Sequence, residues 1–222
     1  GATLLMTNAP VNVSAAVDHL RAGLRIDPND GEAYASLAAA SLRLGRTDEA
    51  VEEGRAAVRL RPDYSPAHYY LASALFRQGK VDESIDQANA ALRVDPDSAE
   101  AHNIMGCLLW QTPGQFDEAI RQFREAVGIN PDFVEAHVNL GAALTRKPGD
   151  TFEVLSEFEE ALRVDPDCRP AHVALGIILS TVPRRRAEAI THLQAALRIQ
   201  PDPRLQKRLD ELQSPPRRRV RH

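Results

Sequence analysis

The stretch that decides the fold is residues 99–133, AEAHNIMGCLLWQTPGQFDEAIRQFREAVGINPDF. In each half of this stretch apolar residues recur every three or four positions, which predicts two amphipathic helices. Pro113-Gly114 separates the two halves. Pro131 ends the second half, because proline lacks a backbone N–H and disfavours helix in the residue before it. The stretch therefore predicts one helical hairpin.

The same pattern recurs along the chain with a period of 34 or 35 residues. Prolines at the phase of Pro131 mark it, namely Pro28, Pro62, Pro96, Pro131, Pro166 and Pro201. A single hairpin cannot bury its apolar face alone, so stacked hairpins share a continuous core. We therefore expect about eleven to thirteen helices and no strands.

The repeat resembles the tetratricopeptide repeat family, in which the fourth position is bulky and the seventh and eighth are Leu-Gly. The fourth position here is Tyr34, His68, His102, His137 and His172. The next two key positions are Leu37-Ala38, Leu71-Ala72, Met105-Gly106, Leu140-Gly141 and Leu175-Gly176. The family's alanine at position 27 is Ala57, Ala91, Ala126, Ala161 and Ala196. The resemblance implies an all-α, right-handed superhelical solenoid of stacked antiparallel helix hairpins.

The repeat phase also predicts how the chain is divided. We expect five repeat units at 31–64, 65–98, 99–133, 134–168 and 169–203. A half-repeat helix at 11–30 precedes them, after a flexible segment at 1–10. Leu205, Leu209 and Leu212 recur at spacings of four and three, which predicts a capping helix at 204–213. A basic, disordered tail at 214–222 follows.

Composition excludes several classes of protein. The formal net charge is −4, which argues against a specific nucleic-acid partner. The two cysteines, Cys107 and Cys168, have no disulfide or metal-site spacing. No apolar run is long enough to span a bilayer. We therefore expect a cytoplasmic protein without a membrane span; a signal removed from a longer parent protein is the alternative.

The sequence predicts no enzyme, no cofactor and no metal site. It holds no phosphate-binding glycine loop, nucleophile elbow or His-Glu-x-x-His helix. His68, His102, His137 and His172 recur once per repeat, but equivalent residues of stacked hairpins lie on the order of 10 Å apart. They cannot share one ion, so we interpret them as packing residues at the fourth position.

One face of the first helix of each hairpin carries the functional hypothesis. Positions 2, 5, 9 and 12 fall on this face, and the family resemblance implies that it lines a concave groove for a protein or peptide. The candidate peptide-binding residues on and beside it are Tyr69, Tyr70, Phe76, Arg77, Asn103, Cys107, Trp110, Val138, Asn139, Arg146, Val173 and Ile177. For Phe76 and Trp110, packing between hairpins is the alternative.

Three functional interpretations follow. The first is a non-catalytic scaffold that binds a peptide or protein segment in the groove. The second is a substrate-recruiting arm of a larger enzyme such as a glycosyltransferase. The third is a structural protein that self-associates through its repeat ends. Arg217, Arg218 and Arg219 add a weak electrostatic binding site as a further alternative.

Overall fold

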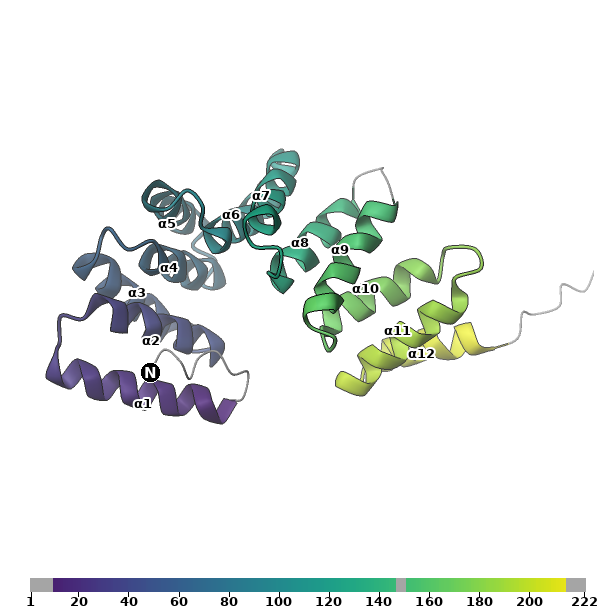
Figure 1. The fold of residues 1–222 in the computed structure, drawn as a ribbon, viewed down its shortest axis with the longest axis horizontal. Helices are drawn as coiled ribbons and strands as arrows, with labels where there is room; N and C mark the ends of the chain where they lie inside the picture. The colour runs from purple at the N-terminus through teal and green to yellow at the C-terminus, as the bar shows by residue number, and fades with distance from the viewer. Residues whose placement is uncertain (1–9, 147–150, 215–222) are drawn as a thin grey trace, which may run out of the picture. The chain divides into compact units, whose positions relative to one another are not determined.

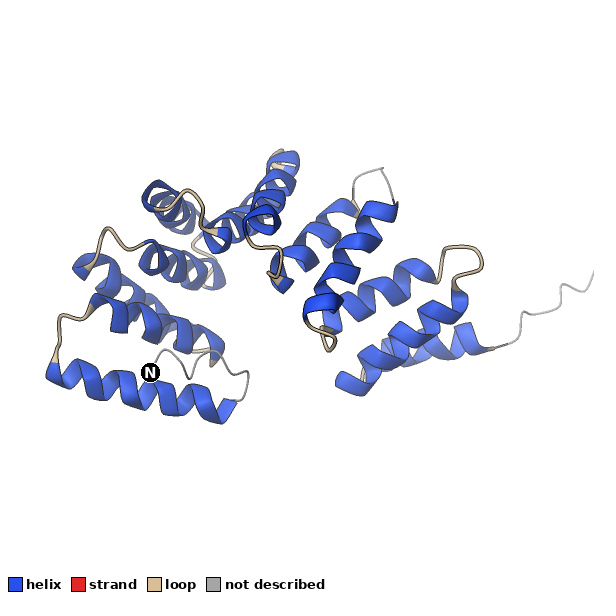
Figure 2. Ribbon diagram, viewed as in Figure 1, coloured by secondary structure: helices blue, strands red, loops and turns tan. Residues whose placement is uncertain are grey.

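The structure is a computed structural model that describes residues 10–146 and 151–214. Within these residues it contains twelve α-helices and no strand, which confirms the all-α prediction (Figure 1, Figure 2). The chain divides into two compact units, residues 1–129 and residues 130–222. The expected flexible segment 1–10 and basic tail 214–222 lie, except for Pro10 and Ser214, outside the described residues.

The first unit is a stack of three hairpins preceded by a single helix. Its helices are α1 (Pro10–Ile26), α2 (Gly31–Arg43), α3 (Thr47–Leu60), α4 (Ser65–Arg77), α5 (Val81–Val94), α6 (Ala99–Gln111) and α7 (Phe116–Ile129). Each helix packs against the next one along the chain, and α4 also contacts both α2 and α6. The first helices α2, α4 and α6 therefore lie side by side (Figure 1).

The second unit contains two hairpins and a final helix. Its helices are α8 (Val134–Leu144), α9 (Thr151–Val164), α10 (Arg169–Leu179), α11 (Arg186–Ile199) and α12 (Pro203–Gln213). The first helices α8 and α10 are in contact, and α12 packs on α11. Leu205 and Leu209 of α12 form a buried cluster with Leu193 and Ala196 of α11. Helix α12 thus covers the last hairpin.

The period prolines end the helices in a recurring turn. In four of the six turns the residue before the proline accepts a hydrogen bond from the backbone N–H of the residue after it. Asp95 and Asp97 make this bond at 3.2 Å. Such Asx turns fix the chain direction locally, which is why a short polar residue flanks the proline. Ser98 then caps α6 by accepting from the backbone N–H of Ala101.

The hairpins pack through complementary pairs of small and large residues. A Cβ added to Gly106 would lie only 2.5 Å from the ring of Phe123, so glycine leaves the space that this ring fills. Gly141 and Phe158 form the same pair, and so do Gly176 and Leu193. In the repeat before that of Gly106 and Phe123, alanines occupy the two equivalent positions. These residues, Ala72 and Ala88, are both fully buried.

Candidate functional site

The candidate site is the face of the first helices predicted above, called here the first-helix face. In the first unit it is carried by α2, α4 and α6, which are neighbours through α4. In the second unit it is carried by α8 and α10. The candidate residues therefore form two groups, each described within its own unit.

Aromatic residues of α4 form the centre of the first group. The rings of Tyr69 and Tyr70 are 4.7 Å apart between centroids and tilted by 47°. Both side chains are half-buried. Tyr70 packs on a buried cluster that includes Leu42 and Leu71. This contact fixes one side of its ring, while the rest of the ring stays accessible. Burial raises the pKa of Tyr70, and Glu100 adds to this effect, so its hydroxyl stays protonated at neutral pH.

Tyr69, Phe76 and Cys107 pack on one shared buried cluster. That cluster contains Ala72 and Ala88 together with Ile104, Met105 and Leu108 of α6. Phe76 thus packs on a core that its own hairpin and the next one share. Burial raises the pKa of the Cys107 thiol to about 11, so this sulfur is a packing group rather than a nucleophile.

Trp110 and Arg77 lie near the ends of their helices. The Trp110 ring lies 5.0 Å from the ring of Phe116, the first residue of α7, and is half-buried. Arg77 Nη1 donates to the backbone carbonyl of Leu42 at 2.5 Å. This carbonyl belongs to the last turn of α2, so Arg77 ties two neighbouring hairpins together. Asn103 is half-buried on α6.

The second group is more aliphatic. Val138, Asn139 and Val173 are half-buried, while Arg146 is exposed. Val173 packs against the cluster that joins α11 to α12. Ile177 is 45% exposed, which makes it one of the large apolar side chains most accessible to a partner.

The four repeated histidines hold the hairpins together by two hydrogen bonds each. The Nε2 atom of each ring lies 2.9–3.0 Å from the carbonyl oxygen of the preceding period proline. The Nδ1 atom bonds a side chain of the second helix, which is Gln87, Gln122, Glu157 or His192 in turn. We call this arrangement the histidine clasp. Within the described residues no three His, Cys, Asp or Glu side chains gather as metal ligands.

The clasp was not predicted, and its two versions in the second unit differ in charge. His137 Nδ1 lies 2.7 Å from the Glu157 carboxylate and Nε2 lies 2.9 Å from the Pro131 carbonyl. A carboxylate and a carbonyl oxygen both accept hydrogen bonds, so these two partners favour the ring that carries a proton on each nitrogen. The hydrogen bond to Glu157 is the main reason that the pKa of His137 is raised. In the next hairpin His172 and His192 face each other with 3.0 Å between their Nδ1 atoms, a distance that holds one proton.

These two pairs predict opposite pH dependences of stability. The pKa of His137 is raised above 6.5 in the folded protein. Its contribution to the free energy of unfolding is therefore complete below pH 6.5, and it is lost as the pH rises through the pKa of the folded protein. Burial, with His172 second, lowers the pKa of His192, so its contribution is present above 6.5 and is lost as pH falls. We expect His192→Gln to reduce the loss of stability in acid and Glu157→Gln to reduce the loss in base.

The measurement is the urea midpoint of the full chain between about pH 5 and 8. Glutamine is the matched replacement, because Gln87 and Gln122 already fill this position in the first unit. Equal pH profiles for both variants and the unmodified chain would contradict the assignment.

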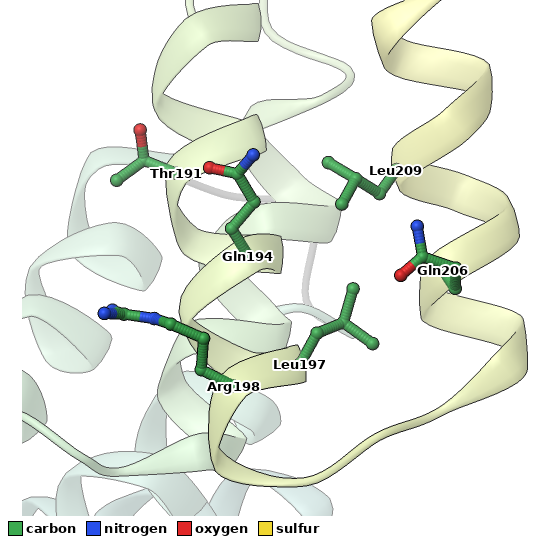
Figure 3. Close-up of a pocket in the computed structure, with 6 residues that line it drawn as sticks. All are labelled: Thr191, Gln194, Leu197, Arg198, Gln206 and Leu209. Atoms are coloured by element: carbon green, nitrogen blue, oxygen red, sulfur yellow. The ribbon is translucent and has the colours of Figure 1, made fainter.

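A pocket lies away from the first-helix face, between α11 and α12 (Figure 3). Its volume is about 630 Å³, and it is lined by Thr191, Gln194, Leu197, Arg198, Gln206 and Leu209. Figure 3 shows Leu197 and Leu209 between the two helices, with polar side chains around them. The pocket lies where α12 packs on α11. None of the predicted site residues lines it.

The structure contains no helix, among the residues it describes, that is both long and apolar enough to cross a bilayer.

Comparisons with known proteins agree with the repeat pattern. A family model described as TPR repeat matches residues 113–147. Two models described as Tetratricopeptide repeat match residues 46–106 and 12–65. Together the three matches span more than half of the chain. No curated protein matches the sequence.

Several solved structures are similar. YrrB, described as a TPR protein with an unusual peptide-binding site, is 22% identical with a TM-score of 0.56, and the match covers 86% of this chain and 97% of YrrB. TTC0263, a thermophilic TPR protein from Thermus thermophilus, is 19% identical with a TM-score of 0.65, covering 82% and 98%. The Cut9-Hcn1 structure of APC/C is 18% identical with a TM-score of 0.80, covering 91% of this chain and 40% of that one. At these identities the likeness shows the fold.

Proposed function

The chain belongs to the tetratricopeptide repeat family, and from this we propose that its first-helix face holds a peptide or protein segment. The family is in general a non-catalytic interaction module, so the chain is a protein-interaction scaffold. The finer proposal concerns the face and the residues that do the binding.

The observation that carries the proposal is the Tyr69–Tyr70 pair. Both rings are supported by buried residues beneath them and are still accessible. Aromatic side chains fixed in this way lose little conformational freedom on binding, and they are enriched among the residues that dominate interfaces. We infer that Tyr69, Tyr70 and Trp110 receive apolar side chains of the partner. YrrB, which is similar in fold, is described as having an unusual peptide-binding site, and this supports a peptide as the kind of partner.

Polar groups beside the aromatic residues would orient the partner. Arg77 uses one N–H on the Leu42 carbonyl, and a guanidinium has five N–H donors in all. Asn103 of the same unit carries an amide that can bond a peptide backbone. In the second unit Asn139 and Arg146 have the same chemistry, and Val138, Val173 and Ile177 supply its apolar surface.

The experiment begins with a pull-down that uses the purified chain to identify a partner. We expect Tyr69→Ala and Trp110→Ala each to weaken binding roughly 30-fold, since a buried aromatic anchor is worth about 2 kcal/mol. Removing residues 214–222 should change affinity little. Raising the salt concentration should also have little effect, because exposed charge pairs contribute only about 0–1 kcal/mol.

Phe152→Ala is the matched control, because Phe152 is 76% exposed on the second helix α9. Thermal melts by circular dichroism verify that every variant is folded. If folded Tyr69 and Trp110 variants bind normally while removal of the tail abolishes binding, the electrostatic tail is the binding site and the proposal is wrong.

A further inference from the structure

All four tyrosines of the chain gather in the first unit, on α2, at the start of α4 and within α4. Three of them pack on a buried cluster formed by Ala35, Ala57 and Ala67, and these three are Tyr34, Tyr64 and Tyr70. The fourth, Tyr69, contacts the ring of Tyr70. All four are half-buried, and we call them the tyrosine cluster. Because Ala35 and Tyr69 both stand at position 5 of their repeats, the cluster belongs to the first-helix face.

Three hydroxyl groups of the tyrosine cluster are not used by the fold. Those of Tyr34, Tyr64 and Tyr70 make no hydrogen bond to any residue that the structure describes. None of the three oxygens is a fully buried atom without a partner, so each can be reached from solvent. A phenolic oxygen accepts hydrogen bonds as well as donating one. The cluster therefore offers three acceptors beside aromatic rings.

The chain already places a cation on one of these rings. The guanidinium carbon of Arg61 lies 5.6 Å from the centroid of the Tyr64 ring, a distance at which the electrons of the ring face attract a positive charge. Arg61 is itself neutralised, since it pairs with Glu32 at 2.8 Å and with Asp63 at 3.1 Å. The local chemistry of the cluster thus suits a cation, and Arg61 leaves the rings of Tyr69 and Tyr70 to others.

A carboxylate stands beside these two rings. Glu100 lies in the first turn of α6, which packs on α4, and it is exposed. It forms no ion pair with the part of the chain that the structure describes. After burial, the charge of Glu100 is the strongest cause of the raised pKa of Tyr70, ahead of the opposing effect of Arg43. The surroundings of Tyr70 therefore favour a positive group over a negative one.

We propose that the tyrosine cluster and Glu100 bind a lysine or arginine side chain of the partner segment. This inference rests on the proposed function and adds the chemistry of the partner, which is basic where it crosses α4. The aliphatic stem of such a side chain supplies the apolar contact with Tyr69 and Tyr70, and its charged end reaches Glu100 and the hydroxyl groups. A cation held in this half-buried place is screened by salt less than an exposed pair is.

The probes are three fluorescein-labelled pentapeptides that differ only at the central residue, which is lysine, arginine or norleucine. An alanine and a leucine flank it on each side. Norleucine has nearly the length of lysine but no charge, so the comparison isolates the cation. Fluorescence anisotropy with the full chain should show that the lysine and arginine peptides each bind roughly tenfold more tightly than the norleucine peptide.

Two variants locate the cation. Glu100→Gln keeps the size of the side chain and should reduce the preference for the basic peptides roughly threefold. Tyr70→Leu keeps an apolar side chain but removes the ring and its hydroxyl, and it should reduce the preference by at least about threefold. The matched control is Glu135→Gln, since Glu135 is an exposed glutamate at the same repeat position in the second unit, which holds no tyrosine. It should leave the preference unchanged. Thermal melts by circular dichroism verify folding, and the exposed position of Glu100 keeps the test valid if Tyr70→Leu unfolds the chain.

The outcomes separate this inference from the proposed function. Equal binding of the three peptides, lost in Tyr69→Ala, would show that the face holds apolar segments and does not recognise a cation. A preference for the basic peptides that persists in Glu100→Gln and in folded Tyr70→Leu would place the cation elsewhere. Absence of binding by all three peptides would also overturn the inference, whereas the proposed function would still be judged on the partner found by the pull-down.

Discussion

Replacing Phe123 with alanine is expected to lower the free energy of unfolding by about 3–5 kcal/mol. The side chain is 2% exposed and packs against Gly106 across its hairpin. Its removal leaves a cavity between α6 and α7, where Gly106 has no side chain to fill the space. Urea unfolding followed by circular dichroism measures the loss, provided that the slope of the transition stays constant.

A double-mutant cycle tests whether Gly106 and Phe123 act as a pair. Gly106→Ala alone places a methyl group 2.5 Å from the ring, and such overpacking costs about 1–3 kcal/mol. Gly106→Ala with Phe123→Ala recreates the Ala72–Ala88 pair of the preceding hairpin. We therefore expect the free energy of unfolding to fall less in the double variant than the sum of the falls in the two single variants. The difference should be about 1 kcal/mol or more.

Gly128 supplies the control for this cycle. It lies in α7 like Phe123, and a Cβ added to it would meet nothing within 4 Å. Gly128→Ala should therefore raise stability by about 0.5–1 kcal/mol, the intrinsic preference of a helix for alanine. Strictly additive losses at Gly106 and Phe123 would show that the two residues are not coupled.

The sequence predicted the helices well because their signals are local. The period prolines, the Asx residues beside them and the three- and four-residue apolar spacing act over one or two turns. The all-α class and the repeated hairpin are confirmed. The repeat limits and the sense of the superhelix along the whole chain stay predictions.

The clasp shows what local patterns miss. The repeated histidines were interpreted as packing residues, and their hydrogen-bond partners stand 19 or 20 positions later and change type from glutamine to glutamate to histidine. A motif search for one residue type cannot find them. Aligning the repeats by phase would reveal a polar residue opposite every fourth-position ring.

The candidate site was predictable only as a helix face. Periodicity places Tyr69, Phe76 and Trp110 on one side of the first helices. It does not show that Phe76 packs on a core shared by two hairpins or that Arg77 bonds the Leu42 carbonyl. Those contacts depend on how closely α2, α4 and α6 approach one another, and the small residues of each hairpin set that distance.

Helix α12 presents two different surfaces. Leu205 and Leu209 face α11, whereas the outer surface carries Arg204, Lys207, Asp210 and Glu211. A solenoid needs such a polar cap because each hairpin otherwise leaves an apolar face open. Helix α12 should therefore contribute strongly to the stability of the second unit.

Deletion of residues 203–222 is expected to lower the free energy of unfolding by about 4 kcal/mol or more, since three leucines leave a buried or half-buried contact. The deletion uncovers Leu193 and Leu197 of α11 and removes the carbonyl of Leu212, to which Arg186 Nε donates at 2.6 Å. The new apolar face should also make the chain self-associate, because an open repeat end can pair with other copies. Urea unfolding and light scattering across protein concentrations measure the two effects.

Two controls separate the cap from the rest of the C-terminal segment. Deletion of residues 215–222 alone leaves α12 intact and should change neither stability nor association. Within α12, Leu209→Ala should cost about 2–5 kcal/mol, whereas Lys207→Ala on its exposed side should stay within about 0.5 kcal/mol of the unmodified chain. If the 203–222 deletion keeps full stability and stays monomeric, α12 does not act as a cap. The apolar face of α11 would then be tolerated in water, and the end of the solenoid would not require a charged helix.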